Sequence, residues 1–538
     1  MSIFSGRTSH LITTVALITL FSCNLPAQNQ VTAIATDSDW YERGAATVEA
    51  ASHRAYNNTP GAAKNIILFV GDGMGVSTVS AARIFAGQQL GLDGEEYELS
   101  YEKFPWTGLS KTYTTDTQVS DSAGTATAFM TGVKTRSGVI NIDSRPQRGD
   151  CAEYMNTPEA TLLTALELAE VAGKATGIVS TARLTHATPA AAYANSPDRN
   201  WENDSAMPAS ARVNGCIDIA TQLIDFEDRL KAKVNAGQNS STIDGLEVAF
   251  GGGRENFFGA DPASLDGFAE APSEGRRNDE RNLIQEWESR GGIYVMGQAG
   301  FDNLDTAGES NVLGLFEAAH MRYEANRSED IAGEPSLTDM TIKAIEILQN
   351  DPDGFFLQVE GGRIDHAHHA NSAYHALNEA KEMAAAVQAA VDMVDINETL
   401  IIVTADHSHV MTFAGYPQRG NPILGIAGRD SLGLPYTTLG YANGSGFNVS
   451  GSTDADLRSG PPSPGRKDLT LVDTTAVGYH QETLVATGGE THAGEDVAIY
   501  AIGPGAHLIS GSIEQNVIFH VMNFAGDLTG KAAEALSQ

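Results

Sequence analysis

Acidic and histidine side chains are concentrated at four points of the 538-residue sequence, each next to an apolar run. The segments are residues 71–75 (GDGMG) with Asp72, residues 359–369 (VEGGRIDHAHH) with Glu360, Asp365 and His369, residues 404–409 (TADHSH) with Asp406 and His407, and residues 490–496 (ETHAGED) with His492. Carboxylate oxygens and imidazole nitrogens are common Zn²⁺ ligands. The four segments therefore predict metal chemistry.

The segment at residues 359–369 carries the most specific signal. If a helix begins near Ile364, Asp365 and His369 are four positions apart on one face and can reach one ion. His366 and His368 then point elsewhere. The alternative is a solvated, histidine-rich helix start whose acidic residue interacts favourably with the helix dipole.

The other three segments are weaker when each is taken alone. Asp406 and His407 follow an apolar run and can both reach a cation where a strand ends, whereas His409 is interpreted as a supporting or structural residue. Asp72 alone is compatible with an exposed acid in a tight turn, and His492 alone with an ordinary loop histidine. Their combination favours two borderline-soft metal ions, with Glu360 and Asp72 left to hold a harder ion that prefers oxygen.

Two neighbouring metal ions suit phosphoryl transfer, because they clamp the attacking and leaving oxygens of an in-line displacement. Ser122, in residues 119–128 (VSDSAGTATA), is the candidate nucleophile. It precedes small residues that predict a closely packed helix, which places its hydroxyl at the positive end of the helix dipole. The alternative is a small-residue helix that only packs against a sheet. No G-x-S-x-G segment favours an esterase triad.

The elements that must position these groups are those of an α/β protein. Apolar runs at residues 65–70, 176–180, 355–359, 400–404 and 497–502 alternate with helical patterns such as residues 161–172 and 373–395. This order predicts a large, mostly parallel central sheet with helices on both faces, within a catalytic domain at residues 61–538. Ligands gather beyond the carboxyl ends of such strands, where the four segments lie.

Three further regions are expected at the periphery. Residues 23–60 are interpreted as an N-terminal arm with Trp40 and Tyr41 as anchors, either in the core or on a partner. Residues 251–310, rich in Gly, Asp and Glu, are expected to form an irregular insertion outside the sheet. Residues 433–488 are expected to be a loop-dominated lobe at the surface.

Composition and charge exclude several classes of function. With 41% apolar residues, the chain can bury a large core and is not a disordered protein. A formal charge of −34 repels nucleic acid and anionic membrane surfaces, so neither is an expected partner.

The N-terminus predicts export. Arg7 and the apolar residues 11–21 are typical of a signal peptide at residues 1–22, and residues 20–23 (LFSC) are similar to a bacterial lipobox whose Cys23 becomes lipidated. The protein is then periplasmic, a cell-envelope or outer-membrane lipoprotein, or secreted. In an oxidising compartment Cys151 and Cys216 most simply form a disulfide, with free thiols or a metal site as alternatives.

With DSAGTATA, VEGGRIDHAHH, TADHSH and THAGED in this order, the chain from about residue 64 to residue 524 resembles the alkaline phosphatases. The segments RIDHAHH, HATP and DRNW, and the placement of Cys151 and Cys216, are closest to the animal-type branch, which joins those cysteines. The resemblance implies hydrolysis of small phosphate monoesters through a phosphorylated Ser122.

The resemblance also implies roles for individual residues. One Zn²⁺ is held by Asp365, His369 and His492, a second by Asp72, Asp406 and His407, and one Mg²⁺ by Asp72, Thr188 and Glu360, while Arg199 grips the phosphoryl oxygens. Asp121, His186 and His366 are expected next to these groups. His186 and His366 replace the Asp and Lys of well-known bacterial members, as in the animal branch.

Two further features follow from the resemblance. Phe316, Glu317 and Glu334 are similar to part of a Ca²⁺ site of the animal branch, although its remaining ligand has no identified counterpart. A lobe at about residues 416–489 corresponds to the crown of the family, which together with the N-terminal arm contacts a second subunit, so a homodimer is expected.

Other functions compete with this interpretation. A phosphodiesterase or nucleotide pyrophosphatase keeps the metals but usually has a Thr nucleophile and lacks the arginine. A sulfatase requires a C-x-P-x-R segment, which is absent. A catalytically silent binder of metal or phosphate would have lost a ligand, whereas every expected ligand is present.

Overall fold

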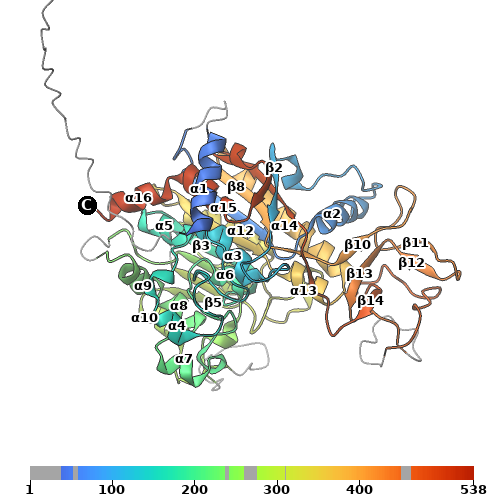
Figure 1. Ribbon diagram of the computed structural model, residues 1–538, viewed down its shortest axis with the longest axis horizontal. Helices are drawn as coiled ribbons and strands as arrows, with labels where there is room; N and C mark the ends of the chain where they lie inside the picture. The colour runs from blue at the N-terminus through green and yellow to red at the C-terminus, as the bar shows by residue number, and fades with distance from the viewer. Residues whose placement is uncertain are drawn as a thin grey trace, which may run out of the picture.

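The computed structural model describes residues 38–52, 59–236, 241–259, 275–308, 311–449 and 462–537. Within them, ten strands form one sheet, in which β16 is antiparallel to both neighbours and all other neighbours are parallel (Figure 1). Their spatial order is β17 (Gly511–Glu514), β2 (Trp106–Lys111), β16 (Val497–Ile502), β8 (Thr399–Ala405), β1 (Asn65–Gly71), β7 (Phe355–Gly361), β3 (Ala175–Arg183), β4 (Val248–Gly252), β6 (Val312–Leu315) and β5 (Ile293–Val295). The five predicted strands are confirmed.

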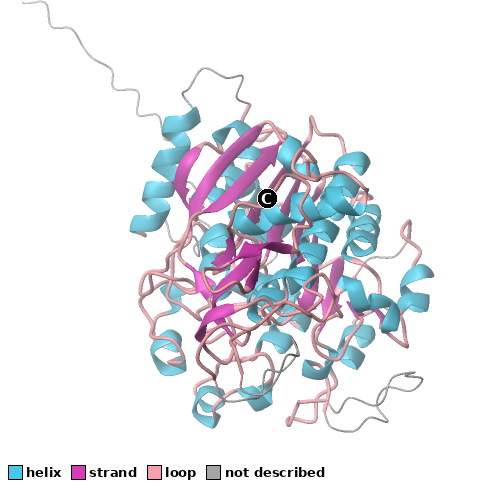
Figure 2. Cartoon of the chain, turned by 90° about the vertical axis from the view of Figure 1, so that its right-hand side faces the viewer, coloured by secondary structure: helices cyan, strands magenta, loops and turns pink. Residues whose placement is uncertain are grey.

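Helices cover both faces of this sheet, as predicted (Figures 1 and 2). They are α1 (Asp39–Ser52), α2 (Val76–Gln89), α3 (Ser122–Thr131), α4 (Cys151–Met155), α5 (Ala165–Val171), α6 (Ala187–Ala190), α7 (Ala209–Val213), α8 (Ile219–Ile224), α9 (Phe226–Lys233), α10 (Leu283–Ser289), α11 (Gln298–Asp302), α12 (Leu337–Leu348), α13 (Arg363–His369), α14 (Ala373–Met393), α15 (Val517–Gly526) and α16 (Leu528–Ala535). Side chains of a strand alternate between faces. Ile66 and Leu68 of β1 therefore join the core under α3, α5 and α15, whereas Ile67 and Phe69 join the core under α2, α12 and α14.

The helix predicted at residues 161–172 is shorter than expected. The hydroxyl of Thr164 accepts a hydrogen bond from the backbone N–H of Glu167, whose carboxylate accepts one from the N–H of Thr164. This capping box stops the helix from extending further toward the N-terminus. The helix predicted at residues 373–395 ends two residues early, at Met393.

Residues 251–310 were expected to lie outside the sheet, and this interpretation is wrong for residues 251–252 and 293–295. Residues 251–252 complete β4, and β5 is the edge strand that pairs with β6. A three-residue strand is too short to show a periodic apolar pattern, which explains the error. Residues 260–274 lie outside the described residues.

The lobe contains short strands as well as loops, at the right of Figure 1. A small sheet has the order β10 (Met411–Phe413), β13 (Leu439–Gly444), β14 (Thr483–Ala486), and β11 (Ile426–Arg429) pairs with β12 (Pro435–Thr437). A further pair, β9 (Ser408–His409) with β15 (His492–Ala493), joins the lobe to two of the histidine segments. Residues 450–461 lie outside the described residues.

The N-terminal helix α1 packs on α15 of its own chain. The Tyr41 ring lies 4.7 Å from that of His520, and Asn516 Nδ2 donates to the carbonyl of Trp40 over 2.5 Å. Trp40 and Tyr41 are therefore anchors, as predicted. The signal segment and Cys23 lie outside the described residues, and no described helix is long and apolar enough to cross a membrane.

Candidate active site

Three carboxylates lie at one edge of the central sheet because three neighbouring parallel strands end there. Gly71 of β1 is in register with Ala405 of β8 and Gly361 of β7. Asp72 and Asp406 follow directly after their strands, and Glu360 is the penultimate residue of β7. All three residues are fully buried. The prediction that these side chains meet at one rim is therefore confirmed.

Ser122 is the first residue of α3, so its hydroxyl lies at the positive end of the helix. Its Oγ is 3.2 Å from Nε2 of His407. Every residue of α3 is buried, and a Cβ added at Gly124 would lie 2.6 Å from the Thr114 methyl group. The run of small residues thus allows the close packing that holds Ser122 at the strand ends.

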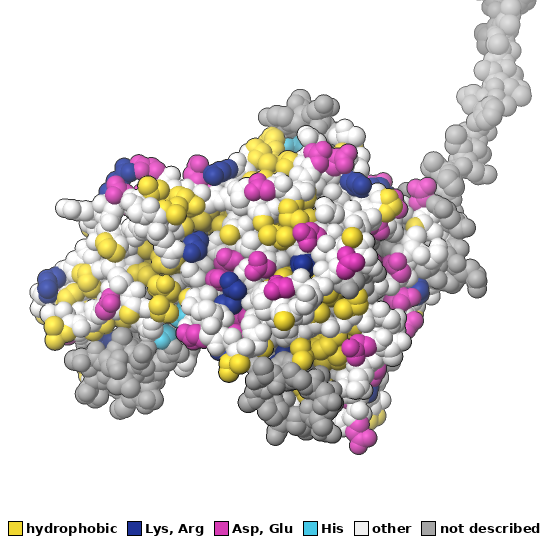
Figure 3. Space-filling view, turned by 180° about the vertical axis from the view of Figure 1, so that it is seen from behind, with side chains coloured by type: hydrophobic (Ala, Val, Ile, Leu, Met, Phe, Trp, Pro, Cys, Tyr) yellow, Lys and Arg dark blue, Asp and Glu magenta, His cyan; other side chains and the backbone are white. Residues whose placement is uncertain are grey.

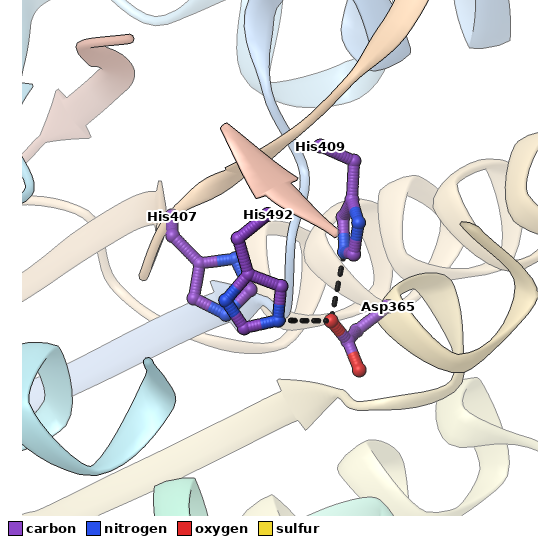
Figure 4. Close-up of side chains that lie close together, drawn as sticks. All are labelled: Asp365, His407, His409 and His492. Atoms are coloured by element: carbon purple, nitrogen blue, oxygen red, sulfur yellow. Dashed lines mark hydrogen bonds and ion pairs between the residues drawn. The ribbon is translucent and has the colours of Figure 1, made fainter. Parts of the chain in front are cut away.

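Asp365, His369 and His492 converge on one point. Oδ1 of Asp365 lies 3.3 Å from Nε2 of His369 and 3.3 Å from Nε2 of His492, and the two nitrogens are 3.1 Å apart. The Asp365–His369 pair lies one turn apart on α13, as the spacing predicted. In Figure 4, Asp365 faces His492, which lies beside His407. Ligand atoms at such separations suit one tetrahedral ion.

Hydrogen bonds fix which nitrogen each histidine presents. Nδ1 of His369 donates to the carbonyl of Glu490 over 2.6 Å, and Nδ1 of His492 donates to the carbonyl of Ser120 over 2.7 Å. With Nδ1 protonated, the lone pair is on Nε2, which points at the shared position. Both histidines are therefore oriented as metal ligands.

A second cluster joins Asp72, Asp406 and His407. Nε2 of His407 lies 3.5 Å from Oδ1 of Asp72 and 3.3 Å from Oδ2 of Asp406. The His407 ring stacks on the His492 ring, with centroids 3.6 Å apart, so the two clusters are adjacent. Because Ser122 contacts His407, its hydroxyl lies beside this second cluster.

A third group forms around Glu360. Ligand atoms of Asp72, His186 and Glu360 lie within 4.8 Å of one another, and Ser180 Oγ donates to the Glu360 carboxylate. Thr188, also predicted here, is fully buried. The structure thus places His186 next to this group, as expected, with a ring nitrogen near enough to be a candidate ligand.

Several buried oxygens of these clusters have no hydrogen-bond partner among the described residues, which shows whether the clusters fit cations. Both Asp72 oxygens, Oδ2 of Asp406, Oε1 of Glu360 and Oγ1 of Thr188 are buried and have no hydrogen-bond partner among the described residues. Burial and neighbouring carboxylates raise the pKa of Asp72 well above its usual range, and burial raises the pKa of Glu360 to about 7. An unpaired buried carboxylate is costly, and a bound cation removes that cost. The residues therefore fit metal ions.

The structure adds a pair that the sequence analysis did not assign to this centre, His409 with Glu490. Nε2 of His409 bonds Oδ1 of Asp365 over 2.7 Å, and its Nδ1 bonds the Glu490 carboxylate over 2.5 Å. Against the effect of burial, these two carboxylates raise the pKa of His409 to about 9. His409 is thus a supporting residue, as predicted, but no sequence spacing indicated Glu490.

Arg199 lies beside the helix that begins with Ser122. Its Nη1 donates to Asp121 Oδ2 and its Nη2 to His186 Nε2, each over 3.0 Å. Asp121 also caps α3, because its Oδ1 accepts from the backbone N–H of Gly124 over 3.3 Å. Against the effect of burial, the Arg199 charge lowers the pKa of Asp121. Asp121 therefore connects the arginine to the start of the serine helix.

The predicted calcium residues come together with one that was not predicted. Glu317 follows Phe316 after β6, and the Glu334 carboxylate accepts from the backbone N–H of Arg322 over 2.9 Å. Asp330 is near both glutamates, and Oδ2 of Asp330 and Oε2 of Glu334 are buried without a partner among the described residues. Burial raises the pKa of Glu334 to about 8. Nε of Arg322 lies 3.3 Å from Oε1 of Glu317 and 3.5 Å from Oδ1 of Asp330, so the oxygens that remain for a hard cation are the unpartnered ones of Asp330 and Glu334.

Cys151 and Cys216 form a disulfide, as predicted. The two cysteines pack with Trp201, Met207 and Ala211. Trp201 follows Arg199 by two positions, and its backbone N–H donates to the carbonyl of Asp198. The disulfide therefore braces the segment that carries the arginine.

Comparison with known proteins identifies the family. Residues 63–528 match the family described as alkaline phosphatase. The human (Homo sapiens) tissue-nonspecific isozyme of alkaline phosphatase is 41% identical over 494 residues, which cover 90% of this chain and 88% of that protein. The alkaline phosphatase of Gadus morhua is 42% identical over 470 residues, which cover 86% of this chain and 91% of that protein. The chain belongs to the alkaline phosphatase family.

Solved alkaline phosphatase structures share the fold. That from Thermus thermophilus aligns with a TM-score of 0.59 at 24% identity, covering 90% of this chain and 98% of the other. That from the Antarctic bacterium TAB5 aligns with a TM-score of 0.56 at 22% identity, covering 88% and 99%. The resemblance to animal-type alkaline phosphatases is thus confirmed, as are the enzyme class and the fold. The family is metal-dependent and acts on phosphate monoesters.

Proposed function

We propose that this alkaline phosphatase hydrolyses phosphate monoesters with Ser122 as the nucleophile and Arg199 as the phosphoryl-binding residue. The observation that carries the proposal is the position of the Ser122 hydroxyl. It lies at a helix N-terminus, 3.2 Å from His407, whose ring stacks on His492 of the neighbouring cluster. A phosphoryl group beside Ser122 would meet both clusters and the arginine.

The proposed ligand sets follow the three clusters. Asp365, His369 and His492 would hold one Zn²⁺, Asp72, Asp406 and His407 a second, and Asp72, Thr188 and Glu360 one Mg²⁺. When bound, these ions offset the negative charge of the site and stabilise charge that develops on the reacting oxygens. His409 and Glu490 would orient Asp365 and neutralise part of its charge.

The side chains divide the reaction between them. Asp121 and His186 each accept one hydrogen bond from the Arg199 guanidinium and so fix its orientation. The remaining N–H groups of the guanidinium would donate to two phosphoryl oxygens. Ser122 Oγ would lose its proton and bond to phosphorus as the ester P–O bond breaks, and the leaving oxygen takes up a proton. Water then attacks phosphorus, which releases Ser122 and inorganic phosphate. The N-terminus of α3 favours the negative charge throughout.

The experiment compares an aryl phosphate monoester with the matching diester, using the chain from residue 23 loaded with zinc and magnesium, at alkaline pH. We expect strong preference for the monoester and loss of activity with a chelator, because Arg199 grips two terminal oxygens that a diester lacks. Preference for the diester would contradict the role of Arg199. Absence of turnover by metal-replete protein would support a binding role instead.

We also propose where the protein acts and what it assembles with. Residues 1–22 would direct export, Cys23 would anchor the chain by lipidation, and the location would be the periplasm or cell envelope.

Phe316, Glu317 and Glu334 would hold Ca²⁺, with Asp330 as a further ligand that the sequence did not indicate. A homodimer would bury the lobe.

A further inference from the structure

Three half-buried histidine rings form a wall next to Arg199. The His186 ring centroid lies 5.5 Å from that of His366 and 5.4 Å from that of His320, and the last two are 4.0 Å apart. All three histidines are partly exposed. The rings thus lie next to Arg199, whose Nη2 donates to Nε2 of His186 over 3.0 Å.

Two of the arginines at this wall are already neutralised. Arg183 donates to both Glu202 oxygens, over 2.7 and 2.6 Å, and also contacts His320. Arg199 is paired with Asp121 at 3.0 Å. Neither has its full charge available to a second anion.

Arg363 differs from both. Its guanidinium lies 4.0 Å from the Tyr323 ring centroid, and no described residue accepts a hydrogen bond from it or forms an ion pair with it. The side chain is half-buried, and its Nε is buried without a partner among those residues. In a sequence with 68 acidic and 34 basic residues, a partly buried arginine without a carboxylate partner is unusual.

Glu379 is the acid whose pKa is influenced by Arg363, but it does not neutralise the charge of Arg363. Glu379 is 3% exposed and accepts from the backbone N–H of Glu324 over 2.5 Å. Burial raises its pKa to about 8, although the Arg363 charge opposes this rise. The two side chains form no ion pair, since the Glu379 carboxylate is bonded to the backbone of Glu324 and the Arg363 guanidinium lies on the Tyr323 ring.

The position of Arg363 relates it to the phosphoryl site. It precedes His366 by three residues on α13, so the two side chains lie one turn apart on the same side of the helix. The His186 and His366 rings and one helical turn separate Arg363 from Arg199. We therefore expect Arg363 to meet the far end of a leaving group several carbons long, and not the phosphoryl group itself.

We infer that Arg363 binds a second anionic group, a carboxylate or phosphate, at the far end of the leaving group of a phosphate monoester. The inference rests on the proposed function and adds a substrate class to it, namely monoesters of polyols or sugar acids with two anionic ends. The guanidinium fork suits such an oxyanion, and the Tyr323 ring holds the fork in place. In a protein of charge −34, a local cation offsets the repulsion of a doubly anionic substrate.

The test uses two substrates that differ in one group, 6-phosphogluconate and sorbitol 6-phosphate. Both are open-chain and carry the same phosphate, and only the first has a carboxylate at the other end. We expect the wild-type enzyme to show a KM for 6-phosphogluconate about tenfold below that for sorbitol 6-phosphate, with similar kcat. Arg363→Met should remove this difference, and Arg363→Lys should restore part of it.

Controls separate this inference from the proposed function. Arg145→Met, at an exposed arginine paired with Asp143 and Glu159, should change neither KM. Equal KM values in the wild type, a difference that survives in Arg363→Met, or equal losses for both substrates in that variant would each overturn the inference. If the wild type hydrolyses sorbitol 6-phosphate, the proposed function stands whatever Arg363 does, and hydrolysis of neither substrate removes both proposals.

Discussion

The side chains of the candidate site are oriented by groups outside it. Backbone carbonyls of Glu490 and Ser120 fix His369 and His492, and Asp121 fixes Arg199. Such supporting bonds hold ligands and the phosphoryl-binding group in place before substrate arrives, so little reorganisation is needed during the reaction. The serine hydroxyl, in contrast, orients neither His369, His492 nor Arg199, although it lies 3.2 Å from Nε2 of His407.

Ser122→Ala therefore tests chemistry separately from structure. We expect phosphoserine formation to disappear and kcat to fall by at least about a thousandfold, because the nucleophile is lost. Zinc content should stay nearly unchanged, since the proposed ligands remain. Phosphoprotein trapped with labelled substrate and metal analysis of the purified variant are the measurements.

Ser120→Ala is the matched control. Its hydroxyl is buried without a partner among the described residues, and the variant keeps the backbone carbonyl that orients His492. Near-wild-type turnover is expected. Comparable turnover in Ser122→Ala, or loss of its zinc, would count against the assigned role.

Among the elements, α5 is connected to the sheet by a buried acid far from the strand ends that carry the site. Glu170, in the last turn of α5, accepts from the backbone N–H groups of Asp244 and Gly245 over 3.0 and 2.8 Å, and from Thr176 Oγ1 over 2.7 Å. It thus links α5 to β3 and to the segment that precedes β4. Burial raises its pKa to about 8 from its ordinary value of 4.5.

This shift predicts a pH-dependent stability. The folded protein binds a proton that the unfolded chain releases, so the free energy of unfolding falls as the pH rises from about 4.5 to about 8. At about 1.4 kcal/mol per pKa unit, the loss approaches roughly 4 kcal/mol. Glu170→Gln keeps a hydrogen-bond acceptor at this position but cannot titrate, so the Tm of the variant relative to that of the wild type should rise across this pH range. Thermal unfolding at fixed metal concentration measures the two Tm values.

Glu159→Gln serves as the control, because this glutamate has 64% of its side chain exposed. Its Tm should follow that of the wild type at every pH. Parallel curves for Glu170→Gln and the wild type would show that Glu170 ionises normally in the folded protein.

The whole molecule exposes apolar side chains on the lobe. Tyr416, Leu432, Leu471 and Leu484 are each 83–99% exposed, and the space-filling view shows hydrophobic patches at the end of the molecule that carries the lobe (Figure 3). Leu484 lies in β14, an edge strand of the small sheet. Exposed apolar patches and open strand edges are typical of association surfaces.

The proposed homodimer can be tested on this surface. Leu484→Asp should shift the protein from dimer to monomer in sedimentation velocity, because a buried charge without a partner is costly. Val213→Asp, at an 86% exposed residue on α7, should leave the dimer intact. A monomeric wild type, or a dimer that persists in Leu484→Asp, would contradict the proposed interface.

Much of the fold and the ligand set could be predicted from local sequence. Buried parallel strands show as continuous apolar runs, and the acids that follow them lie at one rim because such strands end at the same edge. For this reason the local pattern is enough to indicate Asp72, Glu360 and Asp406, and helical spacing is enough to indicate the Asp365–His369 pair. The edge strand β5 escapes such prediction because three residues show no period.

The strands, the helix that starts at Ser122 and the residue types that can bind metal depend on neighbours a few positions apart, so the amino-acid order is enough to indicate them. Which of those residues meet depends on the packing of distant segments. Glu490 reaches His409 across 81 positions, and Arg199 reaches Asp121 across 78. Arg363 lacks an acidic partner among the described residues although acids outnumber bases two to one. Such relations depend on how distant segments pack, which no local spacing records.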